Sequence, residues 1–308
     1  MLLSIIITTR NRKKNLFRCI NSICKSNLPE NNWELIVVDD YSNDGTEKIN
    51  LSKFNIKSGK IIHHKSQQMM VKTRNSGAKI AQGKYLLFID DDNVIHKNMV
   101  KSLLLFAEKN PRYGIFGPSM YFYDNKKKYM DYQTINLFTG KTTSHIEKTI
   151  TPSVKNFFES DGIPNVFMIN HLLLKNINYF DETLIQTYTE PDLTYRLKKI
   201  GYESICITTA ITYHDVKHDK NYGPRTMGGG EFKQKAYFLM RNRSVIVFRY
   251  ANNFQKTIYL LFFSWFWPVI YSIIMAHHKK FDLIRLYWLG YFDGIKYIIT
   301  GKLYNSLL

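Results

Sequence analysis

Cysteine is scarce in this chain, which has only Cys19, Cys24 and Cys206 among its 308 residues. An odd and sparse set without a CxxC pair predicts free thiols in a reducing compartment, and it argues against a disulfide framework or a cysteine zinc site. The apolar residues 1–9 have no basic region ahead of them and no cleavage site. We therefore expect a buried strand there and no cleavable signal peptide.

Acidic residues are also few: 25 Asp and Glu stand against 43 Lys and Arg, which gives a formal net charge of +18. A surface of this sign suits nucleic acid, anionic lipid or phosphorylated small molecules. The basic residues are spread along the chain and no nucleic-acid-binding module is recognisable, so we expect no nucleic-acid partner. Internal repeats and low-complexity linkers are missing as well, while 44% hydrophobic residues predict a packed core.

Strand and helix patterns alternate along the first hundred residues. Buried strands are expected at 3–8, 34–39 and 84–90, with an edge-like strand at 59–63. Helical spacing of apolar residues predicts helices at 11–25, 73–82 and 98–110. The alternation predicts an α/β fold with a mostly parallel, Rossmann-like central sheet and flanking helices, in which ligands bind beyond the carboxyl ends of the strands.

Two of these strands end in acidic residues. Asp39 and Asp40 follow one apolar run, and Asp90, Asp91 and Asp92 follow another. Both clusters are therefore expected on the ligand-binding edge of the sheet. Hard carboxylate oxygens at a strand end suit Mg²⁺ or Mn²⁺ shared with a phosphate. The alternative for the triplet is a solvated acidic turn that caps the next helix.

Other polar residues at this edge allow two interpretations each. Asp39 or Asp40 can hydrogen-bond a base or a ribose, or can only cap a turn. Arg74 precedes the strand at 84–90 and stands near a helix start, where an arginine can clamp a phosphate. A lone arginine at such a place is otherwise an ordinary surface residue.

The ordered motifs resemble those of a known enzyme family. SIIITTRN (4–11), ELIVVDDYSNDGT (34–46) and TRNSGAKIAQGKYLLFIDDDN (73–93) closely resemble the nucleotide-binding half of the family-two inverting glycosyltransferases, which have the GT-A fold. The resemblance implies a nucleotide-sugar donor and Mn²⁺ or Mg²⁺ held by a DxD-type motif. It implies a donor site formed by Thr8, Arg10, Asp39, Asp40, Arg74 and Asp91. The implied metal residues are Asp90, Asp92 and His214, with Asp92 as the direct ligand.

A later acidic stretch fits the same resemblance. TEPDLTYRL (189–197) is similar to the acceptor motif of the family, usually Glu-Asp-x-Asp-Leu, and places Glu190 at the position of the catalytic Asp and Asp192 at that of the second acid. Thr189 replaces the first acid, which leaves open whether Glu190 or Asp192 is the general base. Both can instead be helix acids favoured by the macrodipole, and His214 can be an ordinary structural histidine.

The resemblance implies an inverting reaction, in which a deprotonated acceptor hydroxyl attacks the sugar and no covalent enzyme intermediate forms. No persuasive Ser-His-Asp or Cys-His arrangement is present, as this mechanism requires none. The expected acceptor is a glycan, most plausibly polyprenyl-linked. The alternative activity is a polyprenyl-phosphate sugar synthase, in which the lipid phosphate itself accepts the sugar.

The C-terminal third carries the strongest apolar signal. Residues 257–276 hold no charge over 20 positions, about the length that spans a bilayer as a helix. Pro268 interrupts them, and the Trp and Tyr residues suit an interface, so in-plane or re-entrant membrane association is favoured over a clean span. A second amphipathic stretch covers 281–304. The alternative is a buried bundle or an oligomer interface.

We expect a catalytic domain at 1–215, divided into a nucleotide-binding half (1–100) and an acceptor half (101–215). A basic loop and helix should follow at 216–255, and membrane-associating helices at 256–308. The helix at 231–250 has the pattern of a basic amphipathic helix, lying on anionic headgroups or on a soluble surface. Its YFLMRNR string (237–243) resembles rhamnosyltransferase-like members of the family. The catalytic domain should face the cytoplasm.

Within the acceptor half, residues 111–160 have an irregular pattern with aromatic strands. A second, smaller set of elements is expected at 165–174, 192–200 and 203–208. Residues 215–230 are polar, basic and rich in glycine, which predicts either a loop that closes over the substrates or a plain linker.

Overall fold

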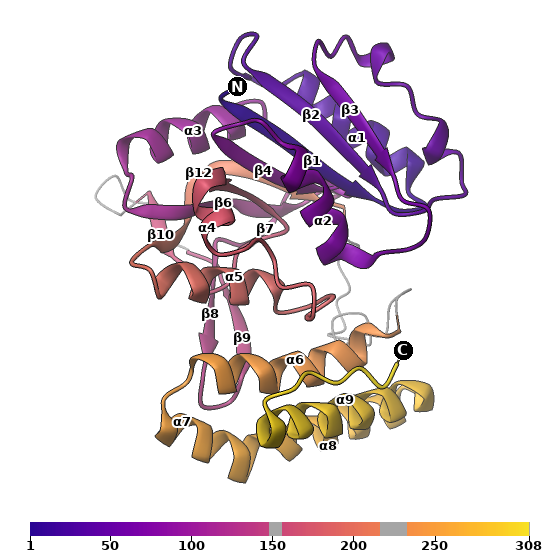
Figure 1. Ribbon diagram of the computed structural model, residues 1–308, viewed down its shortest axis with the longest axis vertical. Helices are drawn as coiled ribbons and strands as arrows, with labels where there is room; N and C mark the ends of the chain where they lie inside the picture. Colours follow the sequence, from indigo (N-terminus) through magenta and orange to yellow (C-terminus); the bar gives the residue numbers. More distant parts are fainter. Residues whose placement is uncertain (148–155, 216–232, 308) are drawn as a thin grey trace. The chain divides into compact units, whose positions relative to one another are not determined.

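The computed structural model describes residues 1–147, 156–215 and 233–307 (Figure 1). Contacts group the chain into two compact units. The first unit comprises Met1–Thr134, Ser144–Glu182 and Leu193–Lys217, and the second comprises Ile135–Thr143, Thr183–Asp192 and His218–Leu308. The expected division at residues 215 and 255 stays a prediction. The loop expected at 215–230 lies, beyond Asp215, outside the described residues.

A large mixed sheet forms the centre of the first unit. Its strand order is β10-β12-β6-β11-β4-β1-β2-β3. The four strands β1 (Leu3–Thr9), β2 (Trp33–Asp39), β3 (Gly59–His63) and β4 (Tyr85–Asp90) are parallel to one another, with β3 at the edge. This confirms the α/β prediction and the four strands expected in the first hundred residues.

The other half of the sheet departs from the expected pattern. Strand β11 (Val166–Asn170) lies antiparallel between β4 and β6 (Tyr113–Phe122), and β12 (Glu203–His214) runs parallel to β6. Short strands β5 (Asn93–Ile95), β7 (Lys128–Met130) and β10 (Phe157–Glu159) extend it. The aromatic strands expected within 111–160 include β6, but β6 is a regular interior strand of ten residues. The strands expected in a second, smaller set of elements are β11 and β12, which belong to this same sheet.

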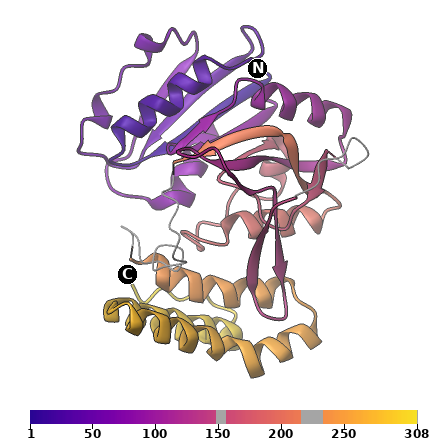
Figure 2. The same cartoon turned by 180° about the vertical axis from the view of Figure 1, so that it is seen from behind.

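Helices cover both faces of this sheet. α1 (Lys13–Cys24) and α3 (Met99–Lys109) share one hydrophobic cluster with alternate residues of β1, β2 and β4. α2 (Met69–Ile80) and α4 (His171–Asn176) pack in the other cluster, on the opposite face. α2 lies over the face seen in Figure 1 and α1 over the face seen in Figure 2. Short 3₁₀ helices span Thr46–Lys48 and Leu51–Phe54.

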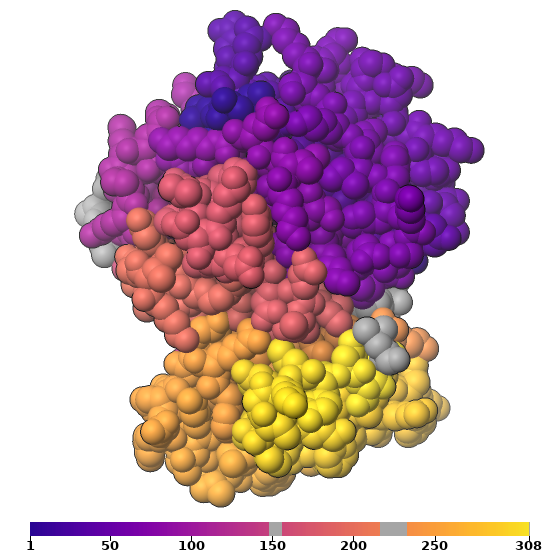
Figure 3. Space-filling model, in the orientation of Figure 1, coloured from indigo at the N-terminus to yellow at the C-terminus, as the bar shows by residue number. Residues whose placement is uncertain are grey.

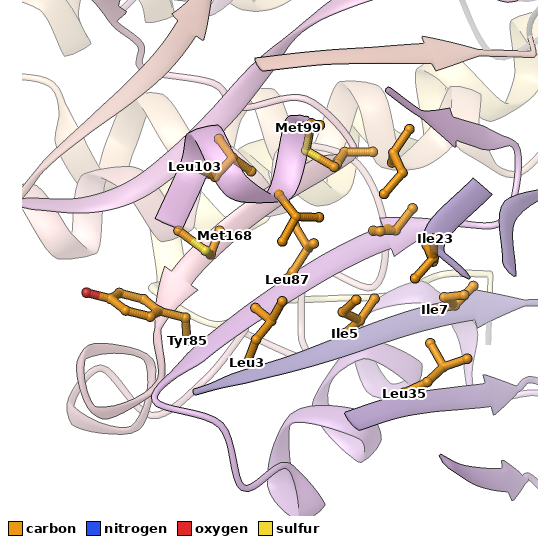
Figure 4. Packing of buried hydrophobic residues seen from close by; sticks show 14 of the residues in the cluster. Leu3, Ile5, Ile7, Ile23, Leu35, Tyr85, Leu87, Met99, Leu103 and Met168 are labelled. Atoms are coloured by element: carbon orange, nitrogen blue, oxygen red, sulfur yellow. The ribbon is translucent and has the colours of Figure 1, made fainter. Parts of the chain in front are cut away.

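The side-chain alternation of β1 explains its continuous apolar run. Leu3, Ile5 and Ile7 point into the cluster with α1 and α3, where Leu87 and Met99 meet them (Figure 4). Ile6, between them, points into the cluster on the other face. Because successive side chains of a strand point to opposite faces, a strand covered on both faces must be apolar at every position.

The second unit is built from helices and two short segments. Its helices are α6 (Lys235–Tyr250), α7 (Asn253–Ile258), a π-helical turn (Tyr259–Phe263), α8 (Ser264–His277) and α9 (Phe281–Thr300). The hairpin of β8 (Tyr132–Asn136) and β9 (Lys141–His145) contributes its tip. α5 (Thr189–Lys198) begins in this unit and ends in the first.

The interpretation of 231–250 as a basic amphipathic helix on a membrane or protein surface was wrong. Most residues of α6 are buried, and its polar core residues Arg241, Asn242 and Arg243 are among them. The guanidinium groups therefore face protein, and the hydrogen bonds that compensate their burial come from the chain itself.

α7, the π-helical turn and α8 form the apolar stretch expected from the sequence. Among the described residues, one helical run, Asn253–His277, is long and apolar enough to cross a membrane, and 22% of its most apolar window is buried. Pro268 stands inside α8 without ending it. Figure 3 shows the surface that the C-terminal helices of the second unit present on one face.

Glycine permits the close packing of α9 on α6. A Cβ atom at Gly290 would lie 2.2 Å from the carbonyl oxygen of Tyr237, and one at Gly294 would lie 2.9 Å from the hydroxyl of Ser244. The spacing of four places both glycines on one face of α9. The two helices can therefore approach to backbone contact.

We predict that Gly290→Ala destabilises the protein by about 2–3 kcal/mol, because the added methyl group forces the helices apart. A loss of stability would indicate the close helix contact, since Gly→Ala in a helix interior otherwise stabilises a protein by up to about 1 kcal/mol. Urea unfolding followed by circular dichroism measures the change. Ile299→Ala, at an exposed position of α9, serves as control and should stay within about 0.5 kcal/mol of the parent. A stabilised Gly290→Ala variant would contradict this packing.

Candidate active site

Parallel pairing brings the two acidic strand ends to one edge of the sheet. β1 lies between β2 and β4, with Thr9 in register with Asp39 and Thr8 in register with Asp90. The prediction that both clusters share the ligand-binding edge is therefore confirmed. The roles proposed for their residues remain predictions.

Each carboxylate of the triplet has different partners. Asp90 accepts hydrogen bonds from Arg74 at 3.0 Å and from the hydroxyl of Thr8 at 3.3 Å. Asp91 accepts from Thr9 at 2.6 Å and from Arg12 at 3.2 Å, and Arg12 also reaches Asp92 at 3.0 Å.

Asp91 and Asp92 are neighbours, but their pKa values shift in opposite directions. Burial raises the pKa of Asp91 to about 7, against the opposing charge of Arg12. Burial also disfavours the charged form of Asp92, but the hydrogen bond and charge of His214, together with Arg12, outweigh it and lower the pKa of Asp92. Asp92 is therefore the ionised member of the pair at neutral pH, which a metal ligand must be.

A histidine from the far half of the sheet meets Asp92. The Nε2 atom of His214, at the end of β12, lies 3.4 Å from Oδ1 of Asp92. The hydroxyl of Tyr129 lies 2.7 Å from the other ring nitrogen and orients the imidazole. The side-chain amide of Asn165 is 3.4 Å from Asp92 and 3.3 Å from His214.

This donor set fits a divalent cation that completes its shell with phosphate and water. A carboxylate oxygen and an imidazole nitrogen suit Mn²⁺, and the carboxylate also suits Mg²⁺. Through residues 1–147, 156–215 and 233–307, no group of three or more His, Cys, Asp or Glu side chains is arranged to hold a metal ion. Asp92 and His214 would therefore offer two donors to such a cation, and Asp90 lies nearby with its carboxylate bound to Arg74.

Asp39 and Asp40 both form hydrogen bonds within the protein. Asp39 accepts from Ser42 in the turn after β2, and its other oxygen is 3.1 Å from His63. Asp40 accepts from the backbone amides of Gln68 at 2.7 Å and Met69 at 2.9 Å, at the start of α2. The capping role thus exists, and a contact with base or ribose stays a prediction.

Arg74 is buried inside the protein beside the acidic strand end. Its side chain is 1% exposed, forms an ion pair with Asp90 and lies over the rings of Phe167 and Phe180. Its contact with the donor, expected from the sequence, stays a prediction, and the structure shows that Arg74 holds Asp90. Arg10 is exposed at the end of β1, as a donor-binding residue should be.

Glu190 and Asp192 belong to the second unit, in the first turn of α5. Asp192 is fully buried and accepts hydrogen bonds from Arg249 at 2.9 Å and Tyr250 at 2.6 Å. Glu190 is partly exposed and accepts a hydrogen bond from Thr189. The structure therefore separates their environments, which the motif alone could not do. Arg196 donates to the carbonyls of Ile177 and Tyr179.

Four residues of this site were not predicted from the sequence: Thr9, Arg12, Tyr129 and Asn165. Arg12 carried a usable signal, because it follows β1 by three residues and so must lie near the same sheet edge. Tyr129 and Asn165 carried none, since their place depends on how β7 and β11 join the sheet.

Together these residues place two candidate metal donors, Asp92 and His214, and the exposed cations Arg10 and Arg12 beside the carboxyl ends of β1 and β4. Cations at such an edge can neutralise a diphosphate, and carboxylates can share a divalent ion with it.

Comparison with known proteins agrees with this chemistry. The family model described as glycosyl transferase family 2 matches residues 4–177. The chain is 30% identical over 122 residues to the poly(ribitol-phosphate) beta-N-acetylglucosaminyltransferase TarP of Staphylococcus aureus strain N315, covering 37% of each chain. It is 32% identical over 113 residues to TarS of S. aureus strain Mu50, an enzyme of the same name, covering 36% of this chain and 19% of that one. The matches thus span about a third and a fifth of these relatives.

Solved structures extend the likeness over the whole chain. Residues 1–349 of S. aureus TarS in complex with UDP-GlcNAc superpose with a TM-score of 0.60 at 18% identity, covering 99% of this chain and 93% of that one. GalNAc-T7 with UDP, GalNAc and Mn²⁺ gives a TM-score of 0.61 at 17% identity, covering 90% and 58%. These likenesses confirm the expected GT-A fold.

The family model covers more than half of the 308 residues, and the acidic strand ends that it spans form the site described above. The chain is therefore a glycosyltransferase and belongs to glycosyl transferase family 2.

Proposed function

We propose that the enzyme transfers a sugar from a uridine diphosphate donor to a hydroxyl group of a phosphate-bearing glycan, with inversion at the anomeric carbon. The observation that carries this proposal is the meeting of Asp92 and His214 beside a second acidic strand end on one parallel edge. The uridine base is proposed because solved relatives of the same fold are complexes with UDP or UDP-GlcNAc.

Donor binding rests on the first unit. Asp92 and His214 would hold Mn²⁺ or Mg²⁺, with Asp90 positioned by Arg74 beside them. When bound, the ion supplies charge stabilisation for the departing diphosphate. Arg12, which is half exposed beside Asp92, and Arg10 can neutralise the remaining phosphate charge.

Glu190 is the better general base for the acceptor hydroxyl. Asp192 is fully buried and held by Arg249 and Tyr250, so its lone pairs are engaged in protein contacts. Glu190 is partly exposed at the start of α5, where a carboxylate can reach a substrate. We propose that Glu190 takes the proton and that the oxygen attacks the face of the sugar opposite the leaving diphosphate.

The acceptor is proposed from the net positive charge of this chain and from the acceptor named for its relatives. The named relatives act on poly(ribitol phosphate), a polymer that carries phosphate, and this chain has a formal net charge of +18. A polyprenyl-linked glycan has the same anionic character, and it is the acceptor we propose for a membrane-associated enzyme. Direct transfer to a polyprenyl phosphate is the alternative that the test of Glu190 distinguishes.

We further propose that the second unit associates with the cytoplasmic face of a membrane. Large apolar side chains remain exposed along α7, the π-helical turn and α8: Phe254, Leu260, Leu261, Phe262, Trp265, Phe266 and Ile273. Basic residues stand close to them, with Lys256 after Phe254 and before the other six, and Lys279 and Lys280 after the last. Aromatic and apolar side chains bordered by lysines favour an anionic bilayer surface.

A nucleotide screen tests the donor. The protein with Mn²⁺ should gain thermal stability from UDP more than from GDP, ADP or CDP, since only a bound nucleotide stabilises the folded state. UDP release from UDP-GlcNAc is then followed with poly(ribitol phosphate) or a polyprenyl diphosphate saccharide. Absence of any Mn²⁺-dependent UDP effect would contradict the proposed donor.

Asp92→Asn should abolish the stabilisation by UDP with Mn²⁺ and lower transfer by on the order of 100-fold or more, because metal charge stabilisation is worth several kcal/mol. Mn²⁺ binding measured by electron paramagnetic resonance should weaken in parallel. Asp124→Asn, at an exposed position after β6, is the matched control. Mn²⁺ binding that survives Asp92→Asn unchanged would place the ion elsewhere.

Glu190→Gln and Asp192→Asn should fail in different ways. Glu190→Gln should lower kcat about 10²–10⁴-fold with little change in melting temperature, because it removes a general base. Asp192→Asn should lower stability by on the order of 2 kcal/mol, because it removes the charge that Arg249 and Tyr250 bind. Steady-state kinetics and thermal unfolding measure both. A normal rate for Glu190→Gln would favour direct transfer to a lipid phosphate.

Phe262→Glu/Trp265→Glu should reduce co-sedimentation with vesicles of equal phosphatidylglycerol and phosphatidylcholine several-fold, since each exposed apolar side chain contributes about 1 kcal/mol or more when buried in lipid. Leu105→Glu/Leu172→Glu changes two exposed apolar residues of the first unit and is the control. Equal loss in both double variants would show that charge alone drives vesicle binding.

A further inference from the structure

A run of polar residues lies buried in the middle of α6 and has no part in the proposed reaction. Arg241, Asn242 and Arg243 are almost fully buried. Burying such groups is unfavourable unless each finds hydrogen-bond partners. Their partners therefore indicate what the run is for.

The segment before α5 has an unusual backbone. Ile185, Thr187 and Tyr188 have φ angles of 63°, 59° and 56°. This left-handed region is uncommon for residues other than glycine and is unfavourable for β-branched side chains. Such residues persist only where surrounding contacts hold them. Glu190 follows this segment by two residues.

Asn242 supplies those contacts. Its side-chain amide nitrogen lies 2.9 Å from the carbonyl oxygen of Leu184, 2.6 Å from that of Gln186 and 3.0 Å from that of Thr187. One amide group thus contacts three carbonyl oxygens of a segment that contains left-handed residues.

Arg241 fixes the amide in this orientation. Its Nε donates to Oδ1 of Asn242 at 2.9 Å, so the amide nitrogen must face the segment. Its Nη2 donates to the carbonyls of Thr183 at 2.7 Å and Leu184 at 3.3 Å. The guanidinium therefore holds the beginning of the same segment.

The last residues of α6 hold the other side of Glu190. Arg249 and Tyr250 bind the carboxylate of Asp192. Arg243 donates to the hydroxyl of Tyr188, which in turn donates to the carbonyl of Gly140 in the hairpin tip. Side chains of one helix thus contact the chain on both sides of Glu190, all within the second unit.

We infer that Arg241 and Asn242 are positioning residues of the transfer reaction: they hold the left-handed segment 183–188 and so fix where the carboxylate of Glu190 lies. The inference rests on the proposed role of Glu190 as general base. It makes α6 part of the acceptor machinery, so the C-terminal helices are more than a separable membrane anchor.

The test compares Asn242→Ala with Tyr237→Phe in the full chain. Tyr237 is also a buried residue of α6, but its hydroxyl donates to Asp293 of α9 and does not touch the segment. Asn242→Ala should lower the kcat of UDP release from UDP-GlcNAc, with poly(ribitol phosphate) or with water alone, about 10–100-fold, since a misplaced catalytic group has this effect. Tyr237→Phe should lower it less than about 3-fold despite a similar loss of stability.

Two readouts separate positioning from general destabilisation. The affinity for UDP with Mn²⁺ should stay unchanged in Asn242→Ala, because the donor residues lie in the first unit. In the Glu190→Gln background, Asn242→Ala should cause no further loss of kcat, because its effect passes through a carboxylate that is already gone. Arg241→Lys, which cannot donate to both Asn242 and Thr183, is a milder second variant and should give an intermediate kcat.

The inference would be overturned if the fold-losses of kcat in Glu190→Gln and Asn242→Ala multiplied in the double variant. Equal losses of kcat in Asn242→Ala and Tyr237→Phe would overturn it as well. If Asn242→Ala does not fold, the kcat of Arg241→Lys is compared with that of Tyr237→Phe, and again in the Glu190→Gln background. A normal rate for Glu190→Gln alone would overturn both the base assignment and the positioning role. An impaired Glu190→Gln beside a control-like Asn242→Ala would overturn the positioning role only.

Discussion

Repulsion among like charges at one sheet edge is the constraint on which the active site depends. Parallel pairing forces the ends of β2 and β4 to flank β1, so Asp90, Asp91 and Asp92 must lie near the acids that end β2. Each carboxylate of the triplet then needs compensation of its own. Arg74 compensates Asp90, Arg12 bridges Asp91 and Asp92, and His214 approaches Asp92 from the opposite half of the sheet.

The charges at this edge also differ in their surroundings. Arg74 is buried with aromatic rings beside it, where its charge stabilises Asp90. Burial favours the protonated form of Asp91, which reduces the repulsion within the triplet. Asp92 keeps its charge and has the more exposed partners Arg12 and His214, which can exchange protein contacts for a diphosphate and its cation. One run of three identical residues thus provides three different environments.

The sequence predicted what local pattern determines. Continuous apolar runs revealed β1, β2 and β4, because each is covered on both faces. The strand order of the other half was out of reach, since Gly117 and Pro118 interrupt the apolar pattern of β6, and the antiparallel insertion of β11 is a long-range pairing. Asn165 takes its place at the site only through that pairing.

The surface position predicted for α6 was wrong for the same reason: the contacts that decide it are long-range. Arginines spaced along a helix resemble a basic surface, because their partners are invisible in the sequence. Here the partners of Arg241 and Asn242 are carbonyl oxygens within 183–187, a segment in which residues such as Ile185 and Thr187 are left-handed. Buried donors without acceptors and strained carbonyls without donors would each be unfavourable alone. Brought together by Arg241 and Asn242, donors and carbonyls satisfy one another, and these hydrogen bonds hold the chain that leads to Glu190.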